Sequence, residues 1–290
     1  MDRPSPHQVT IVGAGIAGLT AALSFAQQGF SVRIFEQAQR LDEAGAGIQL
    51  SPNATRILDR LGVLDTLLPH AVVPDAIAIR DASSTRLLTR LPLKQMAPAG
   101  RAAPYLAVHR ADLQAALLAR VSAAAAIELV TDARLDRLTA DAAGFAATFR
   151  GGTGALEERG TLLVGADGVH SVARRVVAPD AAERSSGFAA WRLTIARSEL
   201  PVSAQRLLPA NEIVTLVDPA FHLVAYPVRA GEAVNLVAVT REGRTPLVDG
   251  PLPSEARRAW PAALSSLVNA DRAWRVWPIH EVACSPWSRA

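Results

Sequence analysis

Cysteine and lysine are nearly absent from this chain of 290 residues, which contains one cysteine, Cys284, and one lysine, Lys94. A single cysteine excludes a framework of internal disulfides and is typical of a reducing compartment, so we expect a cytoplasmic protein. The polar N-terminal stretch lacks the apolar core of a signal peptide, and no window of about 18 uninterrupted apolar residues occurs. We therefore expect neither secretion nor a membrane span.

Positive charge comes almost entirely from arginine, and the formal net charge is only +3. The arginines are spread along the chain without a basic run that contains aromatic residues, so we expect no nucleic-acid partner. The motifs CxxC, HExxH and GxSxG are missing as well, which leaves a metal site or a serine hydrolase without support. Half of the residues are hydrophobic, which is enough for one large domain or two closely packed ones.

The most informative stretch is residues 9–36, which have the pattern of a βαβ unit. The apolar run Val9–Val12 predicts a strand buried on both faces, as in a parallel sheet. Glycines follow, and then a helical pattern that we expect Gly29 to end in a left-handed conformation. A second strand is predicted over 30–35. This order of strand, helix and strand is the framework of a dinucleotide-binding site.

The spacing of the glycines gives each one a separate task. Gly13 permits a tight turn, Gly15 lets the backbone approach a pyrophosphate, and Gly18 lets the helix pack close to the strand. The pyrophosphate then faces the N–H groups at the positive end of the helix, next to Ala14. Glu36 follows the second strand, where a carboxylate accepts hydrogen bonds from a ribose. The pattern predicts a bound dinucleotide and leaves FAD and NAD as alternatives, with a purely structural turn as the competing interpretation.

The whole chain predicts an α/β fold in two parts. In the first part we expect a Rossmann-like nucleotide-binding domain with a parallel sheet. From Gly187 onward the chain is rich in strands, so we expect a mainly antiparallel sheet that forms one wall of a substrate cavity. The expected ranges are 1–75 with 105–180 for the nucleotide domain, 76–104 with 181–278 for the substrate domain, and 279–290 for a return toward the first domain.

Several local predictions can be compared with a structure. Residues 45–49 are glycine-rich and predict a loop close to a ligand, whereas 151–154 predict the turn of a hairpin. Ser51 and Pro52 are expected to begin a helix that Gly62 stops. The strands expected in the second part lie at 191–195, 213–217, 221–226, 234–240 and 274–279, with a helix over 254–269.

Three motifs stand in order and carry a family resemblance. They are GAGIAG at 13–18 with Glu36, GAGIQLSPN at 45–53 and GADGVHSVAR at 165–174. With HRADL at 109–113 between the last two, the chain closely resembles the FAD-dependent aromatic hydroxylases, which are single-component flavoprotein monooxygenases. The branch of salicylate hydroxylase and hydroxybenzoate hydroxylase looks nearest, and the resemblance covers essentially the whole chain.

The resemblance implies that FAD binds to the βαβ unit, with Glu36 on the adenosine ribose. It implies that Arg110 contacts the ribityl-pyrophosphate part, and that Asp167 and Gly168 help to bind FAD and to handle the pyridine nucleotide. NAD(P)H would reduce the flavin without a second fingerprint. Reduced flavin would capture O2 as a hydroperoxide that hydroxylates a small aromatic acid or phenol. The oligomeric state stays open, with a homodimer as one candidate.

One departure from the family pattern bears on function. The family's third FAD motif, a Gly-Asp followed by small residues and a proline, has no counterpart in the 290 residues, although 274–287 looks like the stretch that precedes it. We therefore expect a fragment that lacks its C-terminal part and binds FAD weakly or not at all. The alternatives are a flavin enzyme of the same architecture with another reaction, such as a reductase or an epoxidase, and an inactive fragment.

Candidate catalytic residues lie in one predicted strand of the second part. His222, Val224 and Tyr226 would point to one face, at about 6.6 Å per two-residue step. A histidine and a tyrosine on a cavity wall suit the deprotonation or orientation of a phenol, which raises the electron density of the ring. Packing of both side chains in the sheet is the competing interpretation. Arg192 and Gln49 are candidates for substrate contact, with plain surface exposure as the alternative for Arg192.

Overall fold

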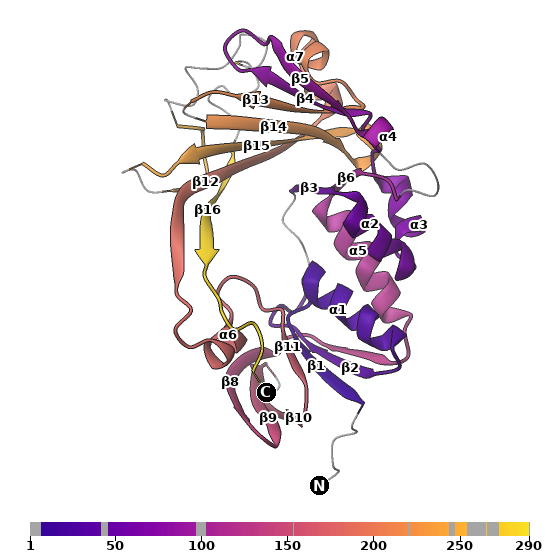
Figure 1. Ribbon diagram of the computed structural model, residues 1–290, viewed down its shortest axis with the longest axis vertical. Helices are drawn as coiled ribbons and strands as arrows, with labels where there is room; N and C mark the ends of the chain where they lie inside the picture. Colours follow the sequence, from indigo (N-terminus) through magenta and orange to yellow (C-terminus); the bar gives the residue numbers. More distant parts are fainter. Residues whose placement is uncertain are drawn as a thin grey trace.

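The structure, a computed structural model, describes residues 7–41, 46–96, 103–152, 154–219, 221–243, 247–253, 265 and 273–289. Two large sheets lie at opposite ends of these residues, and a two-stranded sheet and several helices lie between them (Figure 1). The helix predicted over 254–269 falls outside the described residues, apart from Ser265.

A parallel sheet forms the end of the molecule that carries the glycine-rich turn. Its strands run in the order β11 (Leu163–Gly165), β1 (Gln8–Val12), β2 (Ser31–Phe35) and β7 (Ile127–Val130). Helices α1 (Ile16–Gln27) and α5 (Arg110–Ser122) share an apolar core with β1 and β2. The predicted βαβ unit is confirmed, and Gly29 follows α1 with a φ of +86°.

A three-stranded antiparallel meander packs against the other face of the parallel sheet. It consists of β8 (Arg134–Asp141), β9 (Gly144–Gly151) and β10 (Gly154–Gly160). The pairing of Gly151 with Gly154 confirms the predicted hairpin. Phe35 stacks on Phe149 with ring centroids 4.0 Å apart, so the two sheets share an aromatic contact. β8 is absent from the predictions because its side chains are mostly charged and exposed, without an alternating apolar pattern.

The opposite end is a seven-stranded, mainly antiparallel sheet. Every neighbouring pair is antiparallel except β13 with β4. One face is covered by an apolar core that includes α7 (Val202–Leu207). The predicted fold class, a parallel sheet with a second, mainly antiparallel sheet, is confirmed. The strand order is β16 (Arg275–Val282), β12 (Glu183–Ala196), β15 (Ala233–Arg241), β14 (Phe221–Val228), β13 (Glu212–Val217), β4 (Ala76–Asp81) and β5 (Leu87–Pro92).

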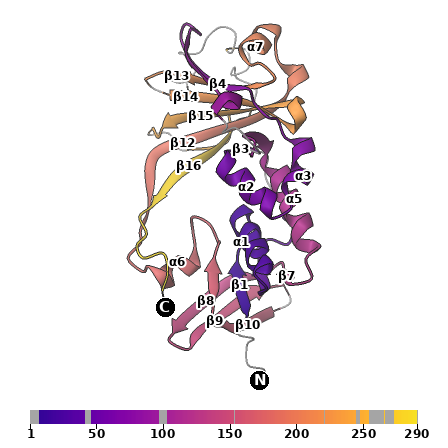
Figure 2. The same cartoon turned by 45° about the vertical axis from the view of Figure 1, so that its right-hand side comes forward.

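Two short strands lie between the large sheets in Figure 1, and Figure 2 shows the first of them, β3, in the same place. β3 (Gly47–Leu50) pairs antiparallel with β6 (Leu106–His109). The predicted loop over 45–49 is therefore wrong for residues 47–49. Their partner strand, β6, lies far along the chain, so no local sequence pattern marks 47–49 as a strand. α2 (Pro52–Arg60) begins after Ser51 as predicted, although the Ser51 side chain makes no cap hydrogen bond.

The remaining helices of the described ranges are short. None of the helices there is long and apolar enough to cross a membrane. The short helices are α3 (Leu64–Leu67), α4 (Leu93–Met96) and α6 (Val172–Val177), with 3₁₀ turns at Leu68–His70, Arg197–Glu199 and Arg229–Gly231.

Candidate functional site

The glycine-rich turn between β1 and α1 is closely packed at two positions and open at the third. Gly13 has a φ of +101°, and a Cβ there would lie 2.4 Å from the Ala166 carbonyl oxygen. A Cβ on Gly18 would lie 1.9 Å from the Gly13 carbonyl oxygen, whereas a Cβ on Gly15 would meet nothing within 4 Å. Gly13 and Gly18 therefore serve packing, and Gly15 keeps space open beside the turn.

Glu36 holds its carboxylate at this turn. One oxygen accepts a hydrogen bond from the Ala14 N–H at 2.7 Å, and the other accepts one from the Ala38 N–H at 2.8 Å. These two bonds fix the carboxylate at the carboxyl end of β2, beside the glycines. The sequence prediction that Glu36 belongs with the glycine turn in space agrees with this arrangement.

A pocket of about 400 Å³ opens at this edge of the parallel sheet. It is lined by the glycine turn, Glu36 and the Asp167–His170 segment. The first turn of α1 carries no acidic side chain, and Gly15 provides no side-chain cap, so the N–H groups there are suited to an anion. Open space at Gly15, a helix N-terminus and a fixed carboxylate together fit the ADP half of a dinucleotide.

Asp167 and Gly168 follow β11 and line the same pocket. The Asp167 carboxylate accepts hydrogen bonds from the Ser171 hydroxyl at 2.5 Å and from the N–H groups of Val172 and Ala173 at 2.7 and 3.1 Å. Asp167 thus accepts hydrogen bonds from the first N–H groups of α6, whose N-cap is Ser171, and positions the turn that lines the pocket. Gly168 has a φ of +82°, a conformation that favours glycine.

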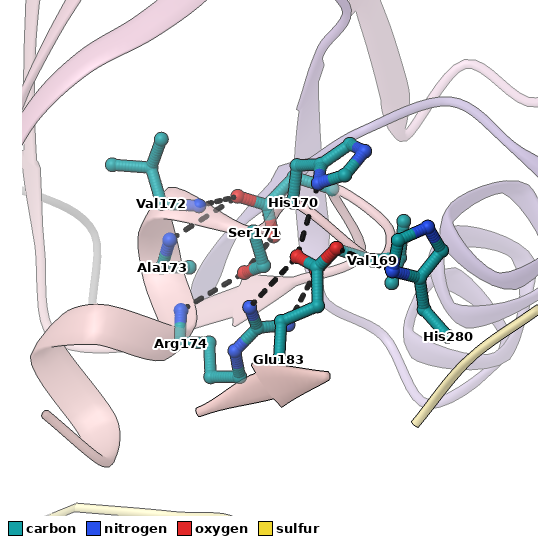
Figure 3. A network of polar contacts seen from close by, with 9 residues as sticks. Val169, His170, Ser171, Val172, Ala173, Arg174, Glu183 and His280 are labelled. Atoms are coloured by element: carbon teal, nitrogen blue, oxygen red, sulfur yellow. Dashed lines mark hydrogen bonds and ion pairs between the residues drawn. The ribbon is translucent and has the colours of Figure 1, made fainter. Parts of the chain in front are cut away.

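A polar network links this segment to the seven-stranded sheet (Figure 3). The Glu183 carboxylate contacts His170 Nδ1 at 3.0 Å and His280 Nδ1 at 2.9 Å, with Arg174 at 3.8 Å. Glu183 begins β12 and His280 lies in β16, so the contact joins these two neighbouring strands to the pocket rim. Sequence reasoning missed this network, because its members are far apart in the chain and no motif connects them.

Arg110 stands where β6 enters α5. Its backbone N–H donates to the Ala46 carbonyl at 2.8 Å, and Gly47 pairs with His109. Two motifs that are separate in the sequence, GAGIQLSPN and HRADL, therefore lie side by side. His109 is buried, and its pKa is lowered by burial and by the positive charge of Arg229. Gly45 lies outside the described residues.

The candidate catalytic strand is β14. Strand alternation places His222, Val224 and Tyr226 on one face, with His222 exposed and Tyr226 only 5% exposed. Partial desolvation of the exposed His222 side chain lowers its pKa, and burial raises the pKa of the Tyr226 hydroxyl. The Cα atoms of His222 and Tyr226 are about 13 Å apart at the usual rise of a strand.

The candidate substrate residues lie on both sides of this strand face. The Tyr105 hydroxyl donates to Gln49 Oε1 at 2.8 Å, which fixes the side-chain amide of Gln49. Arg192 lies in the same row as Val224 in the sheet, and its guanidinium stacks over the Trp277 ring at 5.0 Å from the centroid. Arg192 is thus held against an aromatic side chain and points to the same face as Tyr226.

Comparison with known proteins agrees with this geometry. A family model described as FAD binding domain matches residues 6–245. A 3-hydroxybenzoate 6-hydroxylase from Polaromonas naphthalenivorans (strain CJ2) is 36% identical, over 84% of this chain and 59% of its own length. A 3-amino-4-hydroxybenzoate 2-monooxygenase, PtnB3, from Streptomyces platensis is 32% identical, over 99% of this chain and 72% of its own length.

Solved structures share the fold. HpxO from Klebsiella pneumoniae, complexed with FAD and uric acid, superposes with a TM-score of 0.77 at 22% identity, over 95% of this chain and 68% of that one. The chain belongs to the FAD-dependent aromatic hydroxylases, and FAD is the cofactor of this family's nucleotide site. The chain spans 59% and 56% of the lengths of two of its curated relatives.

Proposed function

We propose that this protein is an FAD-dependent monooxygenase that uses NAD(P)H and O2 to hydroxylate a small aromatic acid or phenol. The observation that carries the proposal is the face of β14 with Tyr226 and His222, which packs against β3 at Gly47. Bound FAD would supply the redox chemistry, by taking reducing equivalents from NAD(P)H and activating O2. The protein's own residues hold the cofactor, orient the ring and move its phenolic proton.

We assign the cofactor's ADP half to the turn at 13–18, with Glu36 on the ribose. Open space at Gly15 and the N–H groups of α1 support a pyrophosphate at this place. Arg110 is assigned to the pyrophosphate-ribityl part, and Asp167 with Gly168 to the rim of the same site. In this arrangement residues 1–75 with 105–180 hold the cofactor, and 76–104 with 181–278 hold the substrate.

We assign His222 as the base that accepts the phenolic proton. Its lowered pKa keeps the imidazole neutral and able to accept a proton near neutral pH. Tyr226 is assigned to a second polar group of the ring, because it lies on the same face of β14, four residues further along the strand. Arg192 is assigned to a substrate carboxylate, and Gln49 to a polar group of the ring or flavin.

The test is NAD(P)H oxidation by the FAD-loaded protein with a panel of hydroxybenzoates and related phenols under ¹⁸O2. We expect at least one ring to accelerate oxidation and to gain one ¹⁸O atom. His222→Gln should lower kcat by about 10²- to 10⁴-fold. His70→Gln, on an exposed 3₁₀ turn, is the matched control and should retain the rate. Oxidation without incorporation would favour a reductase, and no stimulation by any ring would contradict the proposal.

A further inference from the structure

Asn235 is a polar residue at the centre of an apolar strand. It lies in β15, where 233–239 otherwise contain only alanine, valine and leucine, and it is 0% exposed. A buried amide whose groups are left without hydrogen bonds costs about 1–3 kcal/mol. An asparagine at this buried position is therefore expected to make specific hydrogen bonds.

The oxygen of the Asn235 amide has two partners, one on β3 and one on the neighbouring strand β12. Oδ1 accepts hydrogen bonds from the Gly47 N–H at 2.7 Å and from the Thr194 hydroxyl at 3.0 Å. A backbone N–H can only donate, so the amide atom that faces Gly47 is the oxygen, and the orientation of the amide is fixed. Asn235 thereby ties β3 to the seven-stranded sheet.

The nitrogen of the same amide, Nδ2, is buried and makes no hydrogen bond with the described residues. Tyr226 is the direct cross-strand neighbour of Asn235 in the pairing of β14 with β15. Both side chains pack on Gly47, where a Cβ would lie 2.5 Å from Tyr226 Cε2 and 2.8 Å from Asn235 Cγ. The absence of a side chain at Gly47 lets the tyrosine ring and the amide lie together.

The amide lies beside the Tyr226 side chain, across the pairing of β14 with β15. Burial raises the pKa of the Tyr226 hydroxyl, while the positive charge of Arg192 and the Asn235 amide oppose part of the rise. The hydroxyl is therefore protonated at neutral pH. The otherwise unpartnered Nδ2 is the nitrogen that could donate to the hydroxyl oxygen from across the strand pair, and such a bond would occupy an acceptor position and turn the O–H proton toward another acceptor.

We propose that Asn235 is a positioning residue that makes the Tyr226 hydroxyl a hydrogen-bond donor to an anionic oxygen of the aromatic substrate, a carboxylate or a phenolate. This inference rests on the proposed function and names its substrate class. A ring with an anionic oxygen at the Tyr226 end is preferred over the same ring with a neutral ester there. The positive charge of Arg192, on the same face, favours the same sign.

Asn235→Asp removes the donor while keeping the shape, because ionised aspartate offers acceptors only, and Asn235→Ser removes the same N–H without adding a charge, so both variants should show the same difference between acids and esters. Binding of hydroxybenzoates, followed by the change in flavin absorbance, should weaken about tenfold or more, and binding of their methyl esters less than about threefold. Tyr226→Phe should cause a similar loss, and Asn235→Asp should add nothing to it. Thr194→Val removes a partner of Oδ1 but leaves the N–H in place, so this matched control should weaken binding less than about threefold.

A second readout needs neither flavin nor substrate. The sequence holds two tyrosines, so Tyr105→Phe leaves Tyr226 as the sole one. Incorporated fluorotyrosine, which is more acidic than tyrosine, can then be titrated by ¹⁹F NMR. In this background the uncharged variant Asn235→Ser should raise the pKa at position 226, Asn235→Asp should raise it by about one unit or more because it also adds a negative charge, and Thr194→Val should raise it by less.

The two readouts separate the possible failures. Asn235→Ser removes the same N–H and replaces Asn235→Asp if the latter does not fold. An unchanged pKa at position 226 in a folded variant overturns the inference. A raised pKa with no binding of any aromatic acid overturns the proposed function and, with it, the substrate class, but leaves the contact of Asn235 with Tyr226 standing. If the Asn235 variants bind hydroxybenzoates and their methyl esters more weakly by the same factor, the substrate class is also overturned.

Discussion

Gly18 lies so close to Gly13 that a Cβ on Gly18 would fall 1.9 Å from the Gly13 carbonyl oxygen. A Cβ on Gly15, three residues earlier, would meet nothing within 4 Å. One fingerprint thus combines glycines required for packing with a glycine that leaves room for a ligand.

We expect Gly18→Ala to lower the free energy of unfolding by about 1–3 kcal/mol, because the turn or the helix must shift. Gly15→Ala should lower it by less than about 1 kcal/mol. Gly15→Ala should instead weaken FAD binding about tenfold or more, which corresponds to about 1.4 kcal/mol, because the methyl group occupies the space for the pyrophosphate. Urea unfolding and FAD titration measure the two effects. Equal losses of stability in both variants would contradict this division of tasks.

Removal of the Glu158 side chain should lower the free energy of unfolding at least as much as Gly18→Ala does. The Glu158 carboxylate is buried in β10, accepts hydrogen bonds from Gln8 Nε2 at 3.0 Å and Thr10 Oγ1 at 3.3 Å, and pairs with Arg33. Glu158→Ala should cost about 3 kcal/mol, since it leaves a partly buried guanidinium short of one partner. Glu128 contacts the same arginine, but its side chain is 60% exposed, so Glu128→Ala should cost less than about 1 kcal/mol. Similar losses in urea unfolding would refute the importance of burial here.

The lowered pKa of His109 should make the free energy of unfolding depend on pH. The folded pKa of His109 is lowered by burial and by Arg229, and raised in part by Asp112. As the pH falls below the ordinary value of about 6.5, the unfolded chain binds a proton that the folded protein does not, so stability falls. His222 contributes in the same direction. Above that value both states are neutral, and the effect vanishes.

His109→Gln should therefore reduce the loss of unfolding free energy between about pH 7.5 and 5.5. His222 keeps part of the slope, so the dependence becomes weaker without disappearing. Urea unfolding at several pH values measures it, with His70→Gln as the matched control at an exposed site. The same slope in His109→Gln and in the unaltered protein would show that His109 is not the cause.

The sequence predicts the βαβ unit well because its signals are local. The strand of buried residues, the glycine spacing and the stop at Gly29 all lie within one short stretch, and the structure follows them. The strands of the second sheet are predicted for the same reason, since their apolar patterns are bounded by turns at Asp218 and Arg229.

Pairing between distant segments is what the sequence does not reveal. β3 becomes a strand because β6 supplies its partner, and β8 is obscured by a register shift between Leu135 and Arg137. The junction of Gly47, Tyr226 and Asn235 brings three separate segments together. The only sign of this junction in the sequence is a single asparagine within an apolar strand. Its role can be inferred only once the structure shows that Gly47 and Tyr226 lie beside it.

The account's central claim is that residues 13–36 bind the adenosine end of FAD. The most direct measurement is the dissociation constants of FAD, ADP and FMN for the purified protein. The account predicts weak FAD binding at one per chain, displacement by ADP with a constant within about tenfold of that of FAD, and no displacement by FMN. The similar constants follow because residues 13–36 bind the adenosine and pyrophosphate part, which FAD and ADP share. Displacement of FAD by FMN but not by ADP, or no binding of either FAD or ADP, would contradict it.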